Sequence, residues 1–145
     1  MPRIERTAEI VWEGNVARGA GTITAGTGAF AGLPFSLPAR IGKPDGKTSP
    51  EELLAAAHGG CLTMSVASEL TQAGTPPARI ETTVRIVMDE VEGEGHQIVG
   101  SQVTIAVAAD AEDAAVDAAI ERGDAGCPFS TLLRKAGAQV SIERA

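Results

Sequence analysis

The sequence predicts an α+β fold in one domain that spans residues 1–145. Segments with alternating apolar and polar residues, typical of strands, occur in the first part of the chain and again beyond residue 79. Between them lies one long segment with the spacing and end signals of a helix. Strands and helices that do not alternate regularly are typical of the α+β class, and no linker, repeat or low-complexity tract divides the chain. The expected order is β-β-β-α-β-β-α-α-β.

Three strands are predicted before the long helix. Ile4–Trp12 is a strand candidate that ends at the turn-prone residues Glu13–Asn15. Thr22–Thr24 lies in a second strand, and Phe35–Ile41 alternates as a third. Pro38 confines that third strand to the edge of a sheet, because proline has no N–H to donate to a neighbour.

The long helix has clear signals at both ends. Ser49 is a favoured N-cap residue, Pro50 suits the first helical position, and Glu52 completes a capping box. The helix is expected to continue to about Gln72, because Gly74 and two prolines follow. The face expected to be packed carries, at spacings of three and four, Leu53, Leu54, Ala57, Cys61, Met64 and Ser68.

The second half of the chain is predicted to contain a hairpin, two helices and a last strand. Ile80–Val91 and Gln97–Ala108 alternate around a glycine-containing turn and are expected to pair. Ala111–Arg122 is predicted as a helix, Cys127–Lys135 as a short helix, and Gln139–Glu143 as the final strand.

Composition excludes several classes of function. The net charge is −7, and the basic residues are scattered, which argues against a nucleic-acid partner. No apolar stretch is long enough to cross a bilayer, so no membrane association is expected. No secretion signal is recognisable, and we expect a cytoplasmic protein. Two cysteines are too few to indicate a disulfide framework, so their local context has to decide their role.

Cys61 lies within the long helix, where a free cysteine is often only a small core residue. His58 precedes it by one turn on the same face, and Gly59 and Gly60 stand directly beside it. Each glycine inside a helix costs about 1 kcal/mol, so this pair indicates that another group approaches the backbone closely.

Cys127 stands between Gly126 and Pro128, at the expected N-cap of the short helix. Free N–H groups and the helix dipole favour a thiolate there, whereas cysteine is not a usual N-cap residue. The two cysteines can form a disulfide only if the fold brings them together, which their spacing does not establish.

Other chemistry has weaker support in the sequence. His58 and Cys61 could supply two metal ligands, but no second pair completes a site, and a Cys-His hydrolase would lack a third orienting group. We therefore expect no metal and no cofactor. From spacing alone, Glu51 in the first helical turn is better explained as a solvated surface charge, and the same holds for Arg40 at the end of the third strand.

A resemblance to a known family adds to these observations. Thr48–Cys61 closely resembles the signature helix of the osmotically inducible protein C family, which includes the organic hydroperoxide resistance proteins. Ala125–Ser130 resembles the second cysteine site of that family. The segments Val11–Gly14, Arg18–Gly21 and Phe35–Arg40 agree in order, so the resemblance covers nearly the whole chain.

The resemblance implies an OsmC-like fold, with antiparallel sheets packed around a long central helix in an intertwined homodimer. It implies a peroxidase that reduces organic hydroperoxides, and hydrogen peroxide less well. Cys61 would be the peroxidatic thiolate and Cys127 the resolving thiol, joined in a redox-active disulfide that a dithiol, such as a lipoyl-type donor, then reduces. Glu51 would hold an arginine against the reactive sulfur. That arginine is Arg40 in the osmotically inducible branch, which we favour, and Arg18 in the other.

Three features qualify this expectation. Gly59-Gly60 replaces two alanines of the family and Leu62 replaces a phenylalanine, which is expected to enlarge the substrate approach; His58 is a further candidate for the substrate site. Ten helical residues rise about 15 Å, so Glu51 cannot reach Cys61 of its own chain, and we expect composite sites at a dimer interface.

The alternative function is that of a redox sensor or binding protein without turnover, and a third is a scaffold with structural cysteines.

Overall fold

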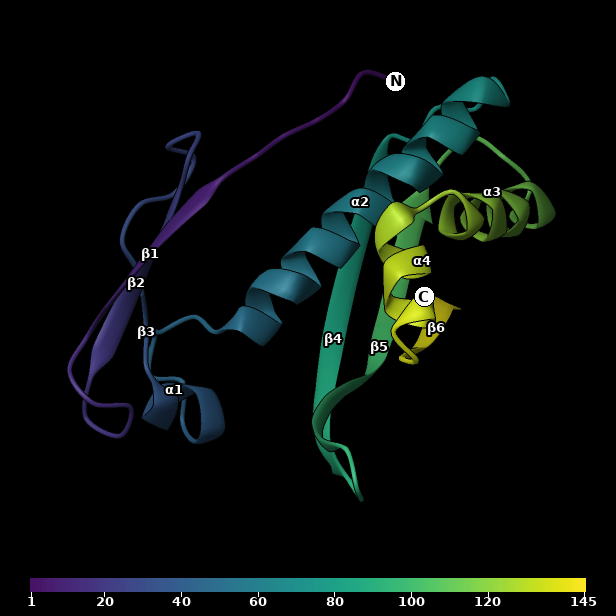
Figure 1. Cartoon of the computed structure of the whole chain (residues 1–145). Coiled ribbons are helices and arrows are strands. Elements are labelled where there is room, and N and C mark those ends of the chain that lie inside the picture. Colours follow the sequence, from purple (N-terminus) through teal and green to yellow (C-terminus); the bar gives the residue numbers. More distant parts are fainter. The chain divides into compact units, whose positions relative to one another are not determined.

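The computed structural model describes residues 1–145, which divide into two units, Met1–Pro50 and Glu51–Ala145 (Figure 1). Three strands come first, followed by a very short helix, a long helix, a hairpin, two further helices and a last strand. This order confirms the α+β class. The expectation of one domain over residues 1–145 stays a prediction.

In the first unit, three strands form an antiparallel sheet in the order β1-β2-β3. They are β1 (Ala8–Glu13), β2 (Ala20–Ala25) and β3 (Leu33–Phe35), with α1 (Leu37–Ile41) directly after them.

The third strand was predicted to continue to Ile41, which is wrong beyond Phe35. Ser36 instead caps α1, because its hydroxyl accepts the N–H of Ala39 at 3.3 Å. Pro38 then occupies the first turn of α1, where a missing N–H has no cost.

The first unit buries few of its side chains. All six residues of β1 are exposed, and Ile10 keeps 57% of its surface accessible. The buried apolar side chains of this unit are Ile23 and Ala39, while Trp12 packs on Phe35 with ring centroids 5.5 Å apart. The apolar surface of β1 is thus left accessible within this chain.

The long helix, α2 (Pro50–Gln72), has the predicted bounds. It ends in a Schellman motif in which Gly74 has a φ of 81°. The Gly74 N–H donates to the carbonyl of Thr71 at 3.0 Å, and the Thr75 N–H donates to that of Leu70 at 2.9 Å. No helix of the chain is both long and apolar enough to cross a membrane.

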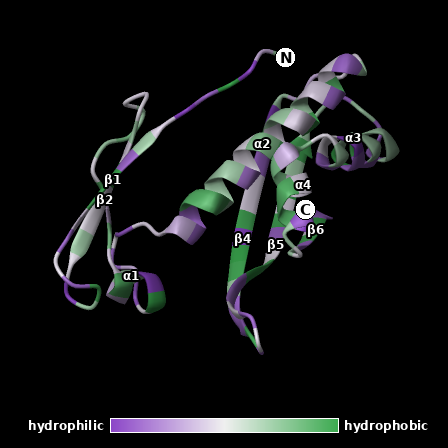
Figure 2. Cartoon of the chain, viewed as in Figure 1, coloured by the Kyte–Doolittle hydropathy of each residue, from purple (hydrophilic) through white to green (hydrophobic).

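The predicted packing face of α2 is displaced from the observed one. Met64 was placed on the packed face but is 70% exposed. The buried positions are His58, Gly59, Leu62, Val66 and Leu70, mostly four residues apart. Small residues dominate this helix, and Figure 2 colours it in short patches of differing hydropathy, so its pattern does not identify one face clearly.

In the second unit, three strands form a sheet in the order β4-β5-β6. β4 (Arg79–Val91) and β5 (Gly95–Ala108) form the predicted antiparallel hairpin. β6 (Gln139–Arg144) pairs in parallel with β5, so the expectation of antiparallel sheets is wrong here. Parallel neighbouring strands need a long crossover connection between them. Between β5 and β6 this crossover is formed by α3 (Asp113–Ala125) and α4 (Pro128–Lys135).

The core of the second unit lies between this sheet and the helices. Val103 and Ile105 of β5 face Leu62, Val66 and Leu70 of α2 in one buried cluster. The members that α3 adds to this cluster are Val116, Ala119 and Ile120. The opposite face of the sheet is polar, as alternation along the strands predicts.

The crossing of α3 over α2 depends on Gly123, whose Cα faces Val66. A Cβ at this position would lie 2.7 Å from Val66 Cγ2, 2.9 Å from its backbone N and 3.0 Å from its Cα. Because two of these atoms belong to the backbone, they cannot move aside as a flexible side chain would. Gly123 therefore sets the distance between the two helices.

Gly123→Ala is expected to lower the free energy of unfolding by roughly 1–3 kcal/mol, because the added methyl group forces the helices apart. Gly126→Ala is the matched control, since its Cβ would meet Arg122 O at an ordinary 3.4 Å. Urea denaturation of both variants measures the difference. Equal stabilities for the two would show that the crossing tolerates a methyl group.

Candidate active site

Cys127 lies at the position that the sequence predicts, the N-cap of α4. Its side chain is completely buried, and its Sγ accepts the N–H of Ser130 at 3.5 Å. The sulfur thus satisfies one of the N–H groups that the first turn of a helix leaves without a partner. The motif Gly-Cys-Pro fits this geometry, because Pro128 fills the first helical position and needs no N–H partner.

Cys61 projects from α2 toward Cys127, and the tertiary structure brings the two thiols into contact. Cys61 is partly buried and packs against the core cluster that includes Cys127. Both cysteines are free thiols. Their spacing in the sequence left this meeting open, and the crossover of α3 and α4 over the sheet produces it.

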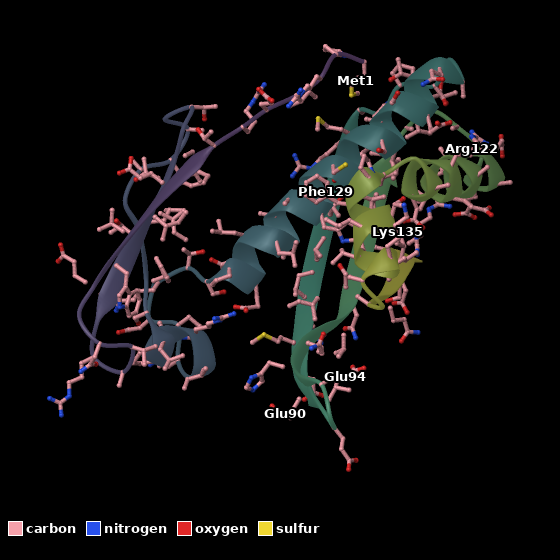
Figure 3. The ribbon with its side chains drawn as sticks, viewed as in Figure 1. Met1, Glu90, Glu94, Arg122, Phe129 and Lys135 are labelled. Atoms are coloured by element: carbon pink, nitrogen blue, oxygen red, sulfur yellow. The ribbon has the colours of Figure 1, made fainter.

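The first turn of α4 meets both sulfurs. The backbone N–H of Ser130 donates to Cys127, and the backbone N–H of Phe129, a residue labelled in Figure 3, acts on the pKa of Cys61. Burial raises the pKa of the Cys61 thiol, contact with Cys127 raises it further, and the Phe129 N–H lowers it. The net effect is a raised pKa, so this setting alone does not favour the Cys61 thiolate.

His58 is buried behind the cysteines, with no exposed surface. Its Nδ1 lies 2.7 Å from Ser101 Oγ on β5, and its Nε2 lies 2.8 Å from Ser130 Oγ on α4. Burial lowers the pKa of the imidazole, which is therefore neutral at neutral pH. The prediction that His58 lines a substrate site has no support here, because both ring nitrogens are bonded inside the core.

The two glycines beside Cys61 differ in their surroundings. A Cβ on Gly59 would lie 3.0 Å from Val84 Cγ2, so close approach of a neighbour is confirmed there. A Cβ on Gly60 would meet nothing within 4 Å. Leu62 is fully buried in the core, and the expectation that it enlarges the substrate approach stays a prediction.

The remaining predicted residues lie elsewhere. Arg18 is in the loop before β2, where its backbone N–H donates to Asn15 Oδ1 at 2.8 Å. Arg40 is in α1 and lines a cavity of about 180 Å³. Glu51 is in the first turn of α2. The cavity at Arg40 is mainly apolar and is lined by Trp12, Val16, Phe35, Ser36, Leu37 and Pro50. The roles predicted for these three residues stay predictions.

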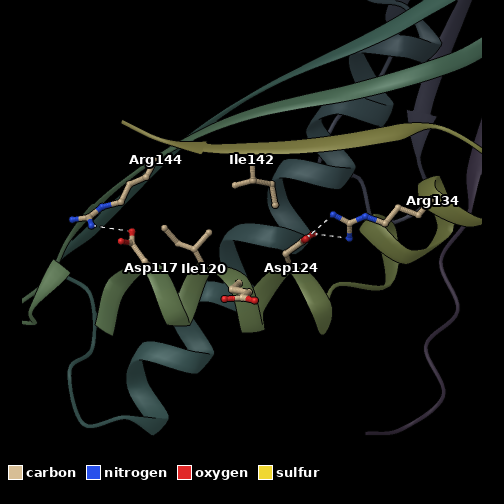
Figure 4. A pocket seen from close by; sticks show the side chains of 7 residues that line it. Asp117, Ile120, Asp124, Arg134, Ile142 and Arg144 are labelled. Atoms are coloured by element: carbon tan, nitrogen blue, oxygen red, sulfur yellow. Dashed lines mark hydrogen bonds and ion pairs between the residues drawn. The ribbon is translucent and has the colours of Figure 1, made fainter. Parts of the chain in front are cut away.

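A separate cavity of about 420 Å³ lies between α3, α4 and β6 (Figure 4). Its charged side chains are largely paired: Arg134 bonds Asp124 at 2.6 Å, and Arg144 bonds Asp117 at 3.0 Å. The Arg134–Asp124 pair joins the end of α3 to α4 and so supports the turn that carries Cys127. No group of three or more His, Cys, Asp or Glu side chains is arranged to hold a metal ion.

Sequence reasoning missed three groups of the site: Ser101, Ser130 and the N–H of Phe129. The sequence does point to Ser101, because this residue alternates with Val103 and Ile105 along β5 and so shares their buried face. A hydroxyl on an apolar face needs a buried polar partner. Nothing in the sequence points to the Phe129 N–H, since only the packing of α4 on α2 determines which sulfur it meets.

Comparisons with known proteins find a matching family and a similar relative. The family described as OsmC-like protein matches residues 42–143. Peroxiredoxin OsmC of Escherichia coli is 34% identical over 132 residues, which cover 90% of this chain and 91% of that protein.

Two solved structures have similar folds. An organic hydroperoxide resistance protein OsmC from Legionella pneumophila is 17% identical with a TM-score of 0.78, and 99% of each chain is covered. The organic hydroperoxide resistance protein OhrB of Bacillus subtilis is 20% identical with a TM-score of 0.76, covering 96% of this chain and 98% of its own. At these identities the two structures show the fold alone.

The buried imidazole of His58 is expected to destabilise the protein at mildly acidic pH. Burial lowers its pKa from the ordinary 6.5, with Asp124 raising it and Arg134 lowering it by charge. The unfolded chain therefore gains a proton at higher pH than the folded chain. The contribution of His58 to the free energy of unfolding is constant above about pH 6.5 and falls as the pH drops below it, down to the folded-state pKa.

Urea denaturation of the wild type and of His58→Gln at about pH 7 and about pH 5.5 tests this. The wild type should lose more stability between the two conditions than the variant, which keeps every other titrating group. An equal loss in both proteins would contradict the assignment.

Proposed function

The chain belongs to the OsmC-like protein family, and from this premise we propose that it is a thiol-dependent peroxidase that reduces organic hydroperoxides and hydrogen peroxide. The single observation that carries the proposal is the contact between the Cys61 and Cys127 thiols beneath the first turn of α4. A partly exposed thiol in contact with a fully buried one suits a peroxidatic and a resolving cysteine. The name of the Escherichia coli relative, a peroxiredoxin, supports the same reaction.

The proposed reaction has two steps on the protein. The Cys61 thiolate attacks one oxygen of the peroxide, the O–O bond breaks, and the leaving alkoxide takes a proton to become an alcohol. Cys61 is thereby oxidised to a sulfenic acid. Cys127 then attacks the Cys61 sulfur, and the sulfenic hydroxyl leaves and takes up a proton as water. A dithiol, such as a lipoyl-type carrier, reduces the resulting disulfide by exchange.

The first step needs a cation near Cys61, because burial raises the pKa of this thiol and only the thiolate is nucleophilic. We assign this role to Arg40, with Glu51 orienting its guanidinium. The apolar cavity that Arg40 lines supports the choice over Arg18, since it joins a guanidinium to a surface that a hydrocarbon group of the peroxide could contact.

The proposed active unit is a homodimer with composite sites. α2 is unbroken from Pro50 to Gln72, so Glu51 and Cys61 of one chain are separated by about 15 Å of helical rise. A second copy of the chain would bring Glu51 and Arg40 to Cys61. The exposed apolar side chains of β1 also support a partner, because a patch of this kind is usually covered by another chain.

Cys61→Ser is expected to abolish peroxide consumption, because Cys127, the other thiol of the site, is fully buried and is not accessible to a peroxide. Cys127→Ser should complete about one turnover and then stop, because its sulfenic acid has no resolving thiol. Stopped-flow peroxide consumption with dihydrolipoamide as reductant measures both. If the wild type forms a disulfide with one equivalent of peroxide but no dithiol supports turnover, the protein is a redox sensor instead.

Arg40→Ala is expected to slow Cys61 oxidation by roughly 10- to 100-fold and to raise the Cys61 pKa, because a charge-assisted bond to the thiolate is lost. The single-turnover rate as a function of pH reports both changes. Arg18→Ala is the matched control. The choice of arginine is wrong if Arg18→Ala alone produces the loss.

The same variant tests the composite site. Mixing Arg40→Ala with Cys61→Ser and exchanging subunits should restore activity in mixed dimers, since one of the two sites then keeps both residues. Sites built from a single chain would gain nothing from mixing.

A further inference from the structure

A chain of buried polar groups connects the sheet to the helix that carries Cys127. It runs from Ser101 of β5 through His58 of α2 to Ser130 of α4. All three residues are fully buried. A neutral imidazole has one donor and one acceptor nitrogen, and a hydroxyl can serve as either, so this chain satisfies both nitrogens. The proposed peroxidase reaction gives none of these three residues a chemical step.

Ser130 links this chain to the cysteine pair. Its hydroxyl bonds to His58 Nε2 at 2.8 Å, while its backbone N–H bonds to Cys127 Sγ at 3.5 Å. The N–H of the residue before it, Phe129, lowers the pKa of Cys61. The first turn of α4 therefore meets the cysteine pair and is also bonded to the imidazole.

We propose that His58 is a positioning residue for disulfide closure: through Ser130 it fixes the first turn of α4 and holds Cys127 in line with Cys61. Closure forms a bond between the two sulfurs only when they approach in the correct geometry. Freedom in this turn would lower the fraction of molecules in which Cys127 can attack. His58 touches neither substrate nor reacting atoms, so its effect falls on the closure step.

This inference rests on the proposed function, so its test uses a closure reaction that needs no peroxide. Ellman's reagent converts the Cys61 thiol to a mixed disulfide and releases one thionitrobenzoate. Cys127 then attacks the Cys61 sulfur, its proton passes to the buffer, and the second thionitrobenzoate leaves as the thiolate. The second release is unimolecular and independent of reagent concentration, and its rate is the closure rate.

The matched variants are Ser130→Ala and Ser101→Ala. Each removes one hydroxyl from His58 and leaves one ring nitrogen without its partner in the same core, so their losses of stability should be similar. Only Ser130→Ala frees the turn of α4. We expect it to slow closure about tenfold, and Ser101→Ala to slow it by less than about threefold. Urea denaturation of both variants verifies that their stabilities match.

Replacement of the histidine gives a second, independent comparison. His58→Gln places an amide where Nε2 meets Ser130, whereas His58→Asn places it where Nδ1 meets Ser101. Glutamine should retain most of the closure rate and asparagine should not. If the His58 variants do not fold, the two serine variants decide the question by themselves.

Equal closure rates for Ser130→Ala and Ser101→Ala would overturn the inference and leave His58 a purely structural core residue. The failure of the proposed function is a separate outcome, since it appears as a wild type that closes its disulfide with Ellman's reagent but consumes no peroxide.

Discussion

The first turn of α4 meets two sulfur atoms, and the arrangement of the site follows from this constraint. The Ser130 N–H donates to Cys127 and the Phe129 N–H lowers the pKa of Cys61, so the two thiols lie side by side although they are 66 positions apart in the sequence. Backbone donors cannot change with rotamer, and their positions depend only on where the helix begins. The His58–Ser130 bond and the Arg134–Asp124 pair hold this helix in place. They therefore also hold the cysteine pair in place.

The same burial that brings the thiols together opposes their ionisation. Burial is the main reason that the pKa of Cys61 is raised, and the single backbone N–H lowers it without reversing that effect. A nucleophilic Cys61 thus needs a positive charge from outside its immediate surroundings. The first unit of the chain carries exposed apolar surface on β1 and an arginine beside an apolar cavity, which are the features that the proposed partner contact would use.

Local signals predicted the helices well where end chemistry decides them. Pro50 and Gly74 delimit α2 as expected, and Cys127 caps α4. The prediction of secondary structure and packing was wrong where a local sequence pattern is compatible with two structures. Residues 35–41 alternate like a strand, but the Ser36 cap and Pro38 favour a helical turn instead. The packed face of α2 was placed wrongly because small residues give that helix little amphipathic contrast, and the sheet decides which side is buried.

The sequence by itself determined most of the elements, the family and the two cysteines that carry the proposed chemistry, since capping residues and short motifs act over a few neighbouring positions. The tertiary structure alone decided that β6 runs parallel to β5, that Cys61 meets Cys127, and that His58 is bonded to serines on two other elements. These contacts join residues 39 to 72 positions apart, with His58 the centre of two of them. No local pattern encodes them, because they depend on how the crossover packs the helices on the sheet.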